Sequence, residues 1–230
     1  PAKYGVRQGV GDTIGPGGVF YGLRHVPVIL EICHDMEDLC PDAWLMNYTN
    51  PMAMICWAVS DYSRIKCVGL CHSVQGTAGD LARYLGAPLH EVSYWVAGIN
   101  HMAWFLTLKW RGEDAYPLLR ERFEDPEVYS GPDAHWAGPD IIRAEIFKAF
   151  GYFNTESSQH MSEYVPYFRK CPELFDRFKL VFHLRQKIEM QRRAIQDEEL
   201  RQLLRSEKKI AIRRSREYCS SIVHCTETGM

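Results

Sequence analysis

The sequence lacks any apolar run long enough to cross a membrane. Its longest obvious run, from Met52 to Val59, is far below the roughly 18 residues that a span needs. It opens with Pro1-Ala2-Lys3-Tyr4, which is not the basic and then apolar start of a signal peptide. No CxxC pair occurs among its cysteines, and five of them lie in hydrophobic segments of the first 71 residues. This usage favours buried free thiols over disulfides and predicts a cytoplasmic protein without a membrane partner.

The sequence also lacks the features of natural termini. It begins without Met and stops at Met230, directly after an apolar helix-like stretch. We therefore expect it to be an internal fragment of a longer protein. Its 230 residues are 46% hydrophobic and 24% charged, which is typical of a globular protein of one or two domains.

Charge of one sign is not in excess, because the formal net charge is −2. Basic residues outnumber acidic ones from Arg169 onward, but the two are interleaved, as in Glu189-Met190-Gln191-Arg192-Arg193. Such a pattern indicates the solvated face of an amphipathic helix and not a one-sign stripe. We expect no nucleic-acid partner.

A glycine-rich segment spans Gly11 to Gly18 but lacks the GxGxxG spacing of a dinucleotide loop. On local grounds a turn is the more probable interpretation. A helical pattern follows, from Val19 to about Leu39.

Two short apolar runs, Ala43–Tyr48 and Lys66–Leu70, are typical of buried strands, and Asn50-Pro51 opens a helix between them. Strand, helix and strand with polar residues at the strand ends predict a doubly wound parallel sheet. The fold class is therefore α/β, an incomplete Rossmann-type and lactate-dehydrogenase-like sheet, whose ligands bind at the carboxyl edge.

The later sequence mixes helical and strand patterns, which predicts an α+β domain with long helices. Helices are expected at 75–85 and 140–150, antiparallel strands at 91–97 and 102–111, an aromatic polar loop at 153–169, and two long helices between about 172 and 224. We predict a division into residues 1–74, the C-terminal part of a dinucleotide-binding domain, and residues 75–230, a truncated substrate and metal domain.

Cys71 and His101 are the strongest candidates for chemistry. Each follows a short apolar run, in Gly69-Leu70-Cys71 and in Gly98-Ile99-Asn100-His101. A thiolate and an imidazole at such positions can share a divalent cation and leave other coordination positions open, as a catalytic metal requires. From these residues alone, a buried structural cysteine and a core histidine stay the more frequent alternatives.

With Tyr4-Gly5 to Gly17-Gly18, Asn47 to Pro51, Cys71 to Val74 and Gly98 to His101, the chain resembles glycoside hydrolase family 4 over essentially its whole length. The family comprises NAD- and metal-dependent glycosidases. Cys71-His72-Ser73-Val74 looks like its α-galactosidase branch. The family's full chain has a preceding strand and glycine-rich turn for the dinucleotide, so the isolated fragment need not be active.

The resemblance implies hydrolysis of α-galactosides by an unusual route. NAD⁺ takes hydride from C3 of the sugar, a base removes the acidified C2 proton, the C1–oxygen bond breaks by elimination, and water adds before the hydride returns. A divalent metal, usually Mn²⁺, would chelate the C2 and C3 oxygens and act as a Lewis acid. NAD and Mn²⁺ are thus the expected cofactors and a sugar the expected small-molecule partner.

The resemblance also implies roles for single residues. Cys71 and His101 are metal ligands, and the thiolate makes activity sensitive to oxidation. His72 stands where the α-glucosidase branch has an acid Asp, so it serves the leaving oxygen or orients the metal shell. Asn50 matches a substrate-binding position, with a helix cap as the alternative. Asn100 is assigned to substrate or second-shell hydrogen bonding.

Two further assignments concern the cofactor-binding residues and the base that removes the C2 proton. Asn47 and Thr49, directly after the first strand, are assigned to the cofactor. The C2 base is expected in the segment 155–164, where Tyr164, Glu156 and His160 are all chemically able to act. We favour Tyr164 slightly, and a structural aromatic residue is the alternative.

Other functions remain open at this point. The same fold can act on an α-glucoside, an α-galacturonide or a 6-phospho-glycoside, although no basic cluster adjoins Cys71 or His101 in the sequence. A 2-hydroxy-acid dehydrogenase would need a catalytic His beside an Arg and no metal Cys. A non-catalytic binding protein that retains the fold is a third possibility. A homo-oligomer, dimer or tetramer, is expected.

Overall fold

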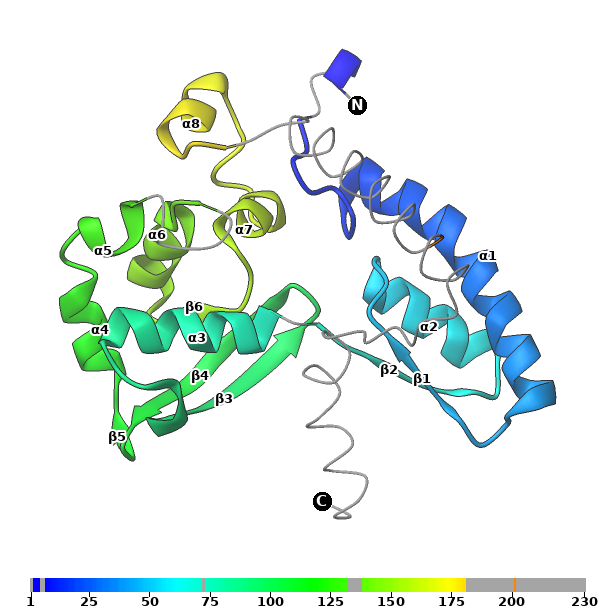
Figure 1. The fold of residues 1–230 in the computed structure, drawn as a ribbon. Helices are drawn as coiled ribbons and strands as arrows, with labels where there is room; N and C mark the ends of the chain where they lie inside the picture. Colours follow the sequence, from blue (N-terminus) through cyan, green and yellow to red (C-terminus); the bar gives the residue numbers. More distant parts are fainter. Residues whose placement is uncertain (1, 5–6, 72, 132–137, 181–200, 202–230) are drawn as a thin grey trace. The chain divides into compact units, whose positions relative to one another are not determined.

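The computed structural model describes residues 2–4, 7–71, 73–131, 138–180 and 201. By its contacts the chain divides into a compact unit of residues 1–182 and a second unit of residues 183–230. The second unit lies outside the described residues except for Arg201, so the elements below all belong to the first (Figure 1). Among the described residues, no helix combines the length and apolar character that a membrane span needs.

A parallel strand pair forms the first part of the fold. β1 (Trp44–Asn47) and β2 (Lys66–Gly69) pair in register from Trp44–Lys66 to Asn47–Gly69, and α2 (Met52–Tyr62) connects them. The Leu70 N–H donates to the Asn47 carbonyl at 2.9 Å, which continues the pairing by one residue. The predicted strand–helix–strand order is therefore confirmed, but the strands are not the buried strands expected, because Asn47 is the one fully buried residue of the two.

α1 (Gly15–Leu39) precedes this unit and begins four residues before the predicted start. Residues 15–18 of the glycine-rich segment form its first turn, where Pro16 lacks an N–H that would have no partner anyway. The Cβ of any larger residue at position 18 would lie 2.5 Å from the Thr13 carbonyl, so glycine permits this loop to fold onto the helix.

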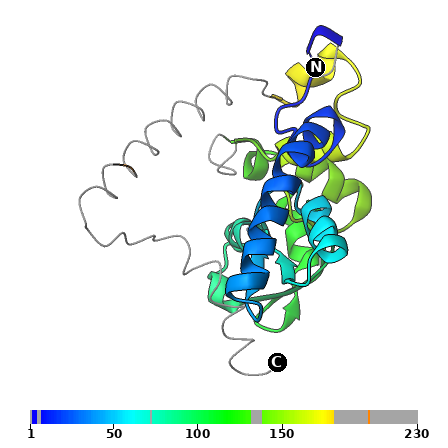
Figure 2. The ribbon, with the colours of Figure 1, turned by 90° about the vertical axis from the view of Figure 1, so that its right-hand side faces the viewer.

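The core of this part joins the two helices and the two strands. Cys33 of α1 packs with Ile55 and Val59 of α2 and with Ile65, and all four are at most 4% exposed. Both views of the molecule show α1 and α2 side by side (Figures 1 and 2). Burial of this apolar surface drives their association.

An antiparallel sheet forms the second part. β3 (Val92–Ile99) pairs with β4 (Met102–Trp110), and β5 (Glu113–Asp114) and β6 (Phe153–Asn154) also pair with β4. The two predicted long strands are confirmed to within two residues at every end. α3 (Ser73–Leu85), followed by the 3₁₀ helix η2 (Leu89–Glu91), packs its apolar face on this sheet.

Short helices complete the unit. They are the 3₁₀ helix η1 (Ala2–Tyr4), α4 (Tyr116–Arg122), α5 (Glu127–Ser130), α6 (Ile141–Phe150), α7 (Ser158–Tyr164) and α8 (Pro172–Arg177). The segment 153–169, expected to be a loop, contains β6 and α7 instead. Ser157 caps α7 by accepting from the His160 N–H, and β6 pairs with β4, so two local devices order this segment. Two long helices were expected between about 172 and 224. Within the described residues this region contains the short helix α8, and nearly all of the rest lies outside them.

Candidate functional site

Cys71 and His101 converge on one point. Cys71 follows β2 at the carboxyl edge of the parallel pair, and His101 occupies the tight turn between β3 and β4. His101 is buried and has a φ of +61°, a conformation that non-glycine residues seldom adopt outside tight turns and functional sites. Gly98 beside this turn has no room for a Cβ, which would collide with Met102 and Ala103 of the facing strand.

Glu156 joins this pair. One ligand atom each from Cys71, His101 and Glu156 lie within 4.8 Å of one another. Glu156 Oε1 is 3.5 Å from Cys71 Sγ and 3.7 Å from His101 Nε2, and it accepts a hydrogen bond from the Ser73 hydroxyl. The carboxylate is only 3% exposed. A thiol, an imidazole and a carboxylate are thus grouped in a buried place, and all three are donors that divalent ions accept.

The other ring nitrogen of His101 has its own partners. Nδ1 lies 2.9 Å from Thr13 Oγ1 and 2.8 Å from Tyr164 Oη. Thr13 also donates to Asp12 Oδ1 at 3.0 Å. The opposite ring nitrogen, Nε2, lies 3.7 Å from Glu156 Oε1 and belongs to the group of ligand atoms that includes Cys71. Partners on Nδ1 that orient the ring in this way are typical of metal-binding histidines.

The loop before α1 therefore belongs to the site. Asp12 Oδ2 accepts from Asn50 Nδ2 at 2.8 Å, which places the predicted substrate-binding Asn50 beside Thr13. Asn50 does not cap α2, because the cap position is Pro51, after a cis peptide bond, and no side-chain cap bond is present there. Asp12, His101 and His160 also form a second group of ligand atoms within 4.8 Å of one another.

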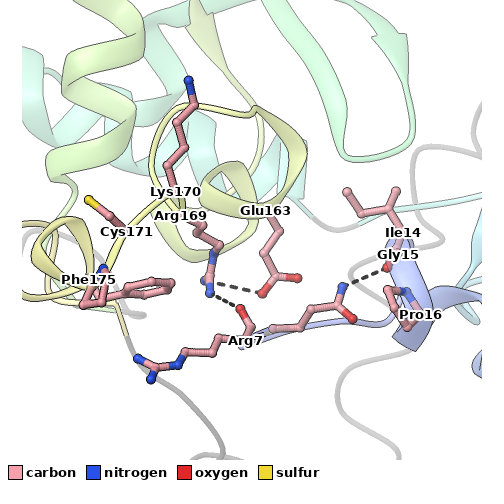
Figure 3. Close-up of a pocket in the computed structure, with 11 residues that line it drawn as sticks. Arg7, Ile14, Gly15, Pro16, Glu163, Arg169, Lys170, Cys171 and Phe175 are labelled. Carbon is pink, nitrogen blue, oxygen red and sulfur yellow. Dashed lines mark hydrogen bonds and ion pairs between the residues drawn. The ribbon is translucent and has the colours of Figure 1, made fainter. Parts of the chain in front are cut away.

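Glu163 holds this loop in place. Its carboxylate accepts three successive backbone N–H groups, from Gly9 at 2.5 Å, Val10 at 2.8 Å and Gly11 at 3.0 Å. Arg169 lies 3.4 Å from the same carboxylate and donates to the Arg7 carbonyl (Figure 3). Because Glu163 adjoins Tyr164, α7 fixes both the loop and the phenol that faces His101.

A pocket of about 440 Å³ opens beside this clamp. Figure 3 shows Arg7, Arg169 and Lys170 around it, with Phe175 on one side and the start of α1 on the other. Three basic side chains against one carboxylate, which backbone N–H groups already bind, give the pocket a positive balance. Such a lining attracts anionic groups.

A buried polar network fixes the main chain next to Glu156. Arg143, fully buried, donates to Asp140 and also to Thr77 Oγ1 at 2.9 Å. Thr77 in turn donates to the Thr155 carbonyl at 2.6 Å, and Thr155 donates to the Ala103 carbonyl of β4 at 3.0 Å. The residue before Glu156 is thus tied to α3 and to the sheet.

Asn100 stands out next to His101. Both polar atoms of its side-chain amide are buried, and neither has a hydrogen-bond partner among the residues that the structure describes. A buried amide without partners costs about 1–3 kcal/mol, which makes Asn100 a candidate for contact with a ligand. This agrees with the role predicted for Asn100 but does not test it.

The remaining predicted residues are less informative. Asn47 lies at the end of β1, and its amide bonds locally, with Nδ2 donating to the Thr49 carbonyl and Oδ1 accepting the Thr49 N–H. The assignment of Asn47 and Thr49 to the cofactor stays a prediction. His72 lies outside the described residues.

The electrostatics reflect burial and close charges. Burial and the charge of Glu156 raise the pKa of Cys71 to about 11. Burial raises the pKa of Glu156. The nearby His160 and His101 and the hydrogen bonds from Ser73 and Cys71 together lower this pKa by more, so the net shift is downward. Burial and then nearby carboxylates, Asp12 first among them, raise the pKa of Tyr164.

Sequence reasoning missed four members of this site: Asp12, Thr13, Ser73 and Glu163. The polar pair Asp12-Thr13 inside a glycine-rich loop was an available signal, because a simple turn does not require it. Glu163 gave no such signal, since its partners lie 152 to 154 positions away in the chain.

The chain matches two family models. Residues 1–87 match the model described as Family 4 glycosyl hydrolase, and residues 96–230 match the model of the C-terminal domain of that family. The alpha-galactosidase of Bacillus subtilis is 41% identical over 235 residues, which cover 100% of this chain and 52% of the relative. The alpha-galactosidase of Rhizobium meliloti is 38% identical, with 100% and 48% covered.

An alpha-galacturonidase of Thermoanaerobacterium saccharolyticum is 32% identical over 75% of this chain and 41% of its own length. The chain spans about half the length of the curated relatives it matches.

Solved structures resemble the fold. The crystal structure of lplD from Bacillus subtilis has a TM-score of 0.80 at 26% identity, covering 98% of this chain and 54% of that one. A 6-phospho-alpha-glucosidase from gut microorganisms, in complex with NAD and Mn²⁺, has a TM-score of 0.56 at 24% identity, with 67% and 37% covered. The latter likeness shows the fold alone. Together with the parallel and antiparallel sheets, these structures confirm the predicted α/β fold.

Proposed function

Because this chain belongs to the family 4 glycosyl hydrolases, we propose that it carries the catalytic site of an α-galactosidase that uses NAD and a divalent metal ion. The observation that carries the proposal is the grouping of half-buried Cys71 with buried His101 and Glu156, next to the buried amide of Asn100. The preference for α-galactosides draws on the two alpha-galactosidases that resemble the whole chain. A dehydrogenase or a non-catalytic protein has no comparable support.

The residues present fit the two cofactors. Cys71 and His101 would hold the cation, since a thiol and a ring nitrogen belong to one group of ligand atoms within 4.8 Å of one another. Asn47 and Thr49, at the carboxyl edge of the parallel pair, would contact the dinucleotide. When bound, NAD supplies reversible hydride transfer at C3 of the sugar, and the cation supplies a Lewis acid for the sugar oxygens.

The chain's own residues then bind the sugar and move one proton. Asn100 donates and accepts hydrogen bonds with sugar hydroxyls, and Asn50, held by Asp12, does the same. Tyr164 takes the proton from C2. Its Oη lies 2.8 Å from Nδ1 of His101, and a proton on that nitrogen would stabilise the phenolate that a base must form, against the burial that raises the pKa of Tyr164.

The positive pocket beside Glu163 favours a second candidate within the family. A galacturonide carboxylate or a sugar phosphate would be attracted by Arg7, Arg169 and Lys170. The alpha-galacturonidase at 32% identity makes the carboxylate the stronger of the two. This pocket could not be predicted from the sequence, because its basic residues are distant from Cys71 and His101 along the chain.

A substrate panel tests the proposal. The full-length protein is assayed with nitrophenyl α-galactoside, α-galacturonide, α-glucoside and β-galactoside, and with galactoside 6-phosphate, each with and without NAD, Mn²⁺ and a thiol reductant. We expect release of nitrophenol from the α-galactoside only when all three additions are present. Turnover without NAD or without a divalent ion contradicts the proposed mechanism, and preference for the galacturonide selects the second candidate. A cytoplasmic location and a homo-oligomeric state accompany the proposal as predictions.

A further inference from the structure

We propose that Glu156 is a third protein ligand of the divalent cation, so that the site consists of a thiolate, an imidazole and a carboxylate. The inference rests on the proposed function, because it concerns the same cation that Cys71 and His101 would hold. It differs from the role that the sequence analysis considers for Glu156, which is that of a general base.

The distances fit a shared ion. Two ligands bound at about 2.0–2.3 Å to one ion lie roughly 2.8–3.3 Å apart in octahedral and roughly 3.3–3.7 Å apart in tetrahedral coordination. Glu156 Oε1 is 3.5 Å from Cys71 Sγ and 3.7 Å from His101 Nε2. Two separate atoms are therefore already at the spacing that a common cation would impose on Oε1.

The charge of Glu156 needs compensation. A buried carboxylate is costly unless a positive charge or hydrogen bonds offset the loss of water. Asp140, equally buried, contacts the Arg143 guanidinium at 2.7 and 2.8 Å. Within the described residues, both ion-pair partners of Glu156 are histidines, which carry charge only when protonated. A divalent cation supplies the positive charge that Arg143 supplies to Asp140.

The surroundings are those of a ligand and not of a mobile base. The Asn154 amide donates to the Glu156 carbonyl at 2.9 Å, and Thr155 is tied to β4 and α3, so the main chain is fixed on both sides. The second oxygen, Oε2, lies 3.3 Å from His160 Nδ1, which leaves Oε1 to face Cys71 and His101. Outer partners that orient a ligand in this way are typical of metal sites.

Binding of Mn²⁺ to the full-length protein, freed of metal by a chelator, tests the inference without any assay of activity. Free Mn²⁺ is measured by electron paramagnetic resonance for the wild type, Glu156→Gln and Cys71→Ser. Glu145→Gln, the same change on the exposed side of α6, is the matched control. We expect Glu156→Gln to weaken Mn²⁺ binding by about tenfold or more and Glu145→Gln to leave it unchanged.

The outcomes separate the inference from the proposed function. If Cys71→Ser weakens binding and Glu156→Gln does not, Glu156 is not a ligand, while the cation site stands. If Cys71→Ser leaves binding unchanged, the cation site of the proposed function is itself wrong.

Should Glu156→Gln not fold, as judged by circular dichroism, Glu156→Asp decides. It retains the carboxylate but shortens its reach, so we expect the visible bands of the Co²⁺-loaded protein to shift while the thiolate charge-transfer band stays. Unchanged visible bands in Glu156→Asp overturn the inference.

Discussion

At the scale of single residues, three buried carboxylates of this protein are stabilised in three different ways. Asp140 contacts a guanidinium, Glu163 accepts three backbone N–H groups, and Glu156 faces a thiol and imidazoles. The first two arrangements are complete within the chain. Of the three, Glu156 is the one whose surroundings a bound cation would complete, so we expect a functional role for this carboxylate and structural roles for the other two.

Arg143→Met tests the structural arrangement. The change removes the cation beside Asp140 but keeps a side chain of similar length, so it leaves a buried charge without its partner. We expect the free energy of unfolding in urea to fall by about 3–5 kcal/mol. Arg64→Met, at a side chain that is 87% exposed and pairs with Glu37, is the control and should cost less than about 1 kcal/mol. Equal losses in the two variants would contradict this account.

Glu91 provides a pH-dependent contribution that does not involve the active site. Hydrogen bonds from Arg111 and then Trp110 lower its pKa from 4.5 to about 2. Because the folded-state pKa is the lower one, the stabilisation is present above pH 4.5 and is lost as the pH falls towards 2. We expect the difference in melting temperature between the wild type and Glu91→Gln to shrink over that range. A difference that stays constant between pH 6 and pH 2 excludes this linkage.

At the scale of elements, the positions of the strands and helices could largely be predicted from the sequence. The contacts between elements that are distant in the chain could not. β1, β2, β3 and β4 lie close to the predicted positions, because short apolar runs bounded by polar and turn residues specify strands locally. The segment 153–169 could not be predicted, because β6 is a strand only through its pairing with β4. Cys71 and His101 could be proposed from the family motifs that contain them. Asp12 and Thr13 could not, because they contact Asn50 and His101 across 38 and 88 positions of the chain. Glu163 of α7 binds the loop that carries them.

Glu163→Ala tests this connection between α7 and the loop before α1. The change leaves the N–H groups of Gly9, Val10 and Gly11 without their acceptor, at a cost of about 1–3 kcal/mol if they stay buried. We expect faster cleavage by a protease within residues 7–13 and lower turnover, because Thr13 no longer holds His101. Glu163→Gln, which keeps one acceptor oxygen, should be intermediate. If both variants match the wild type in cleavage and in turnover, Glu163 does not hold the loop.

At the scale of the whole molecule, the site brings together segments that are far apart in the sequence. Thr13 and His101 are separated by 88 positions, and Ser73 and Glu156 by 83. Such closures cost chain entropy, which the native contacts must offset. A ligand that binds only the closed arrangement therefore stabilises the folded state as a whole.

Binding of Mn²⁺ should accordingly raise the stability of the protein. A ligand that binds only the folded state at about 100 times its dissociation constant adds about 2.7 kcal/mol. We expect the melting temperature of the metal-free protein to rise with Mn²⁺ concentration and this rise to disappear in Cys71→Ala. Cys40→Ser, a change at an exposed thiol, is the matched control and should retain the rise. An equal rise in Cys71→Ala would place the stabilising ion elsewhere, because the cation would then not depend on the thiolate at the end of β2.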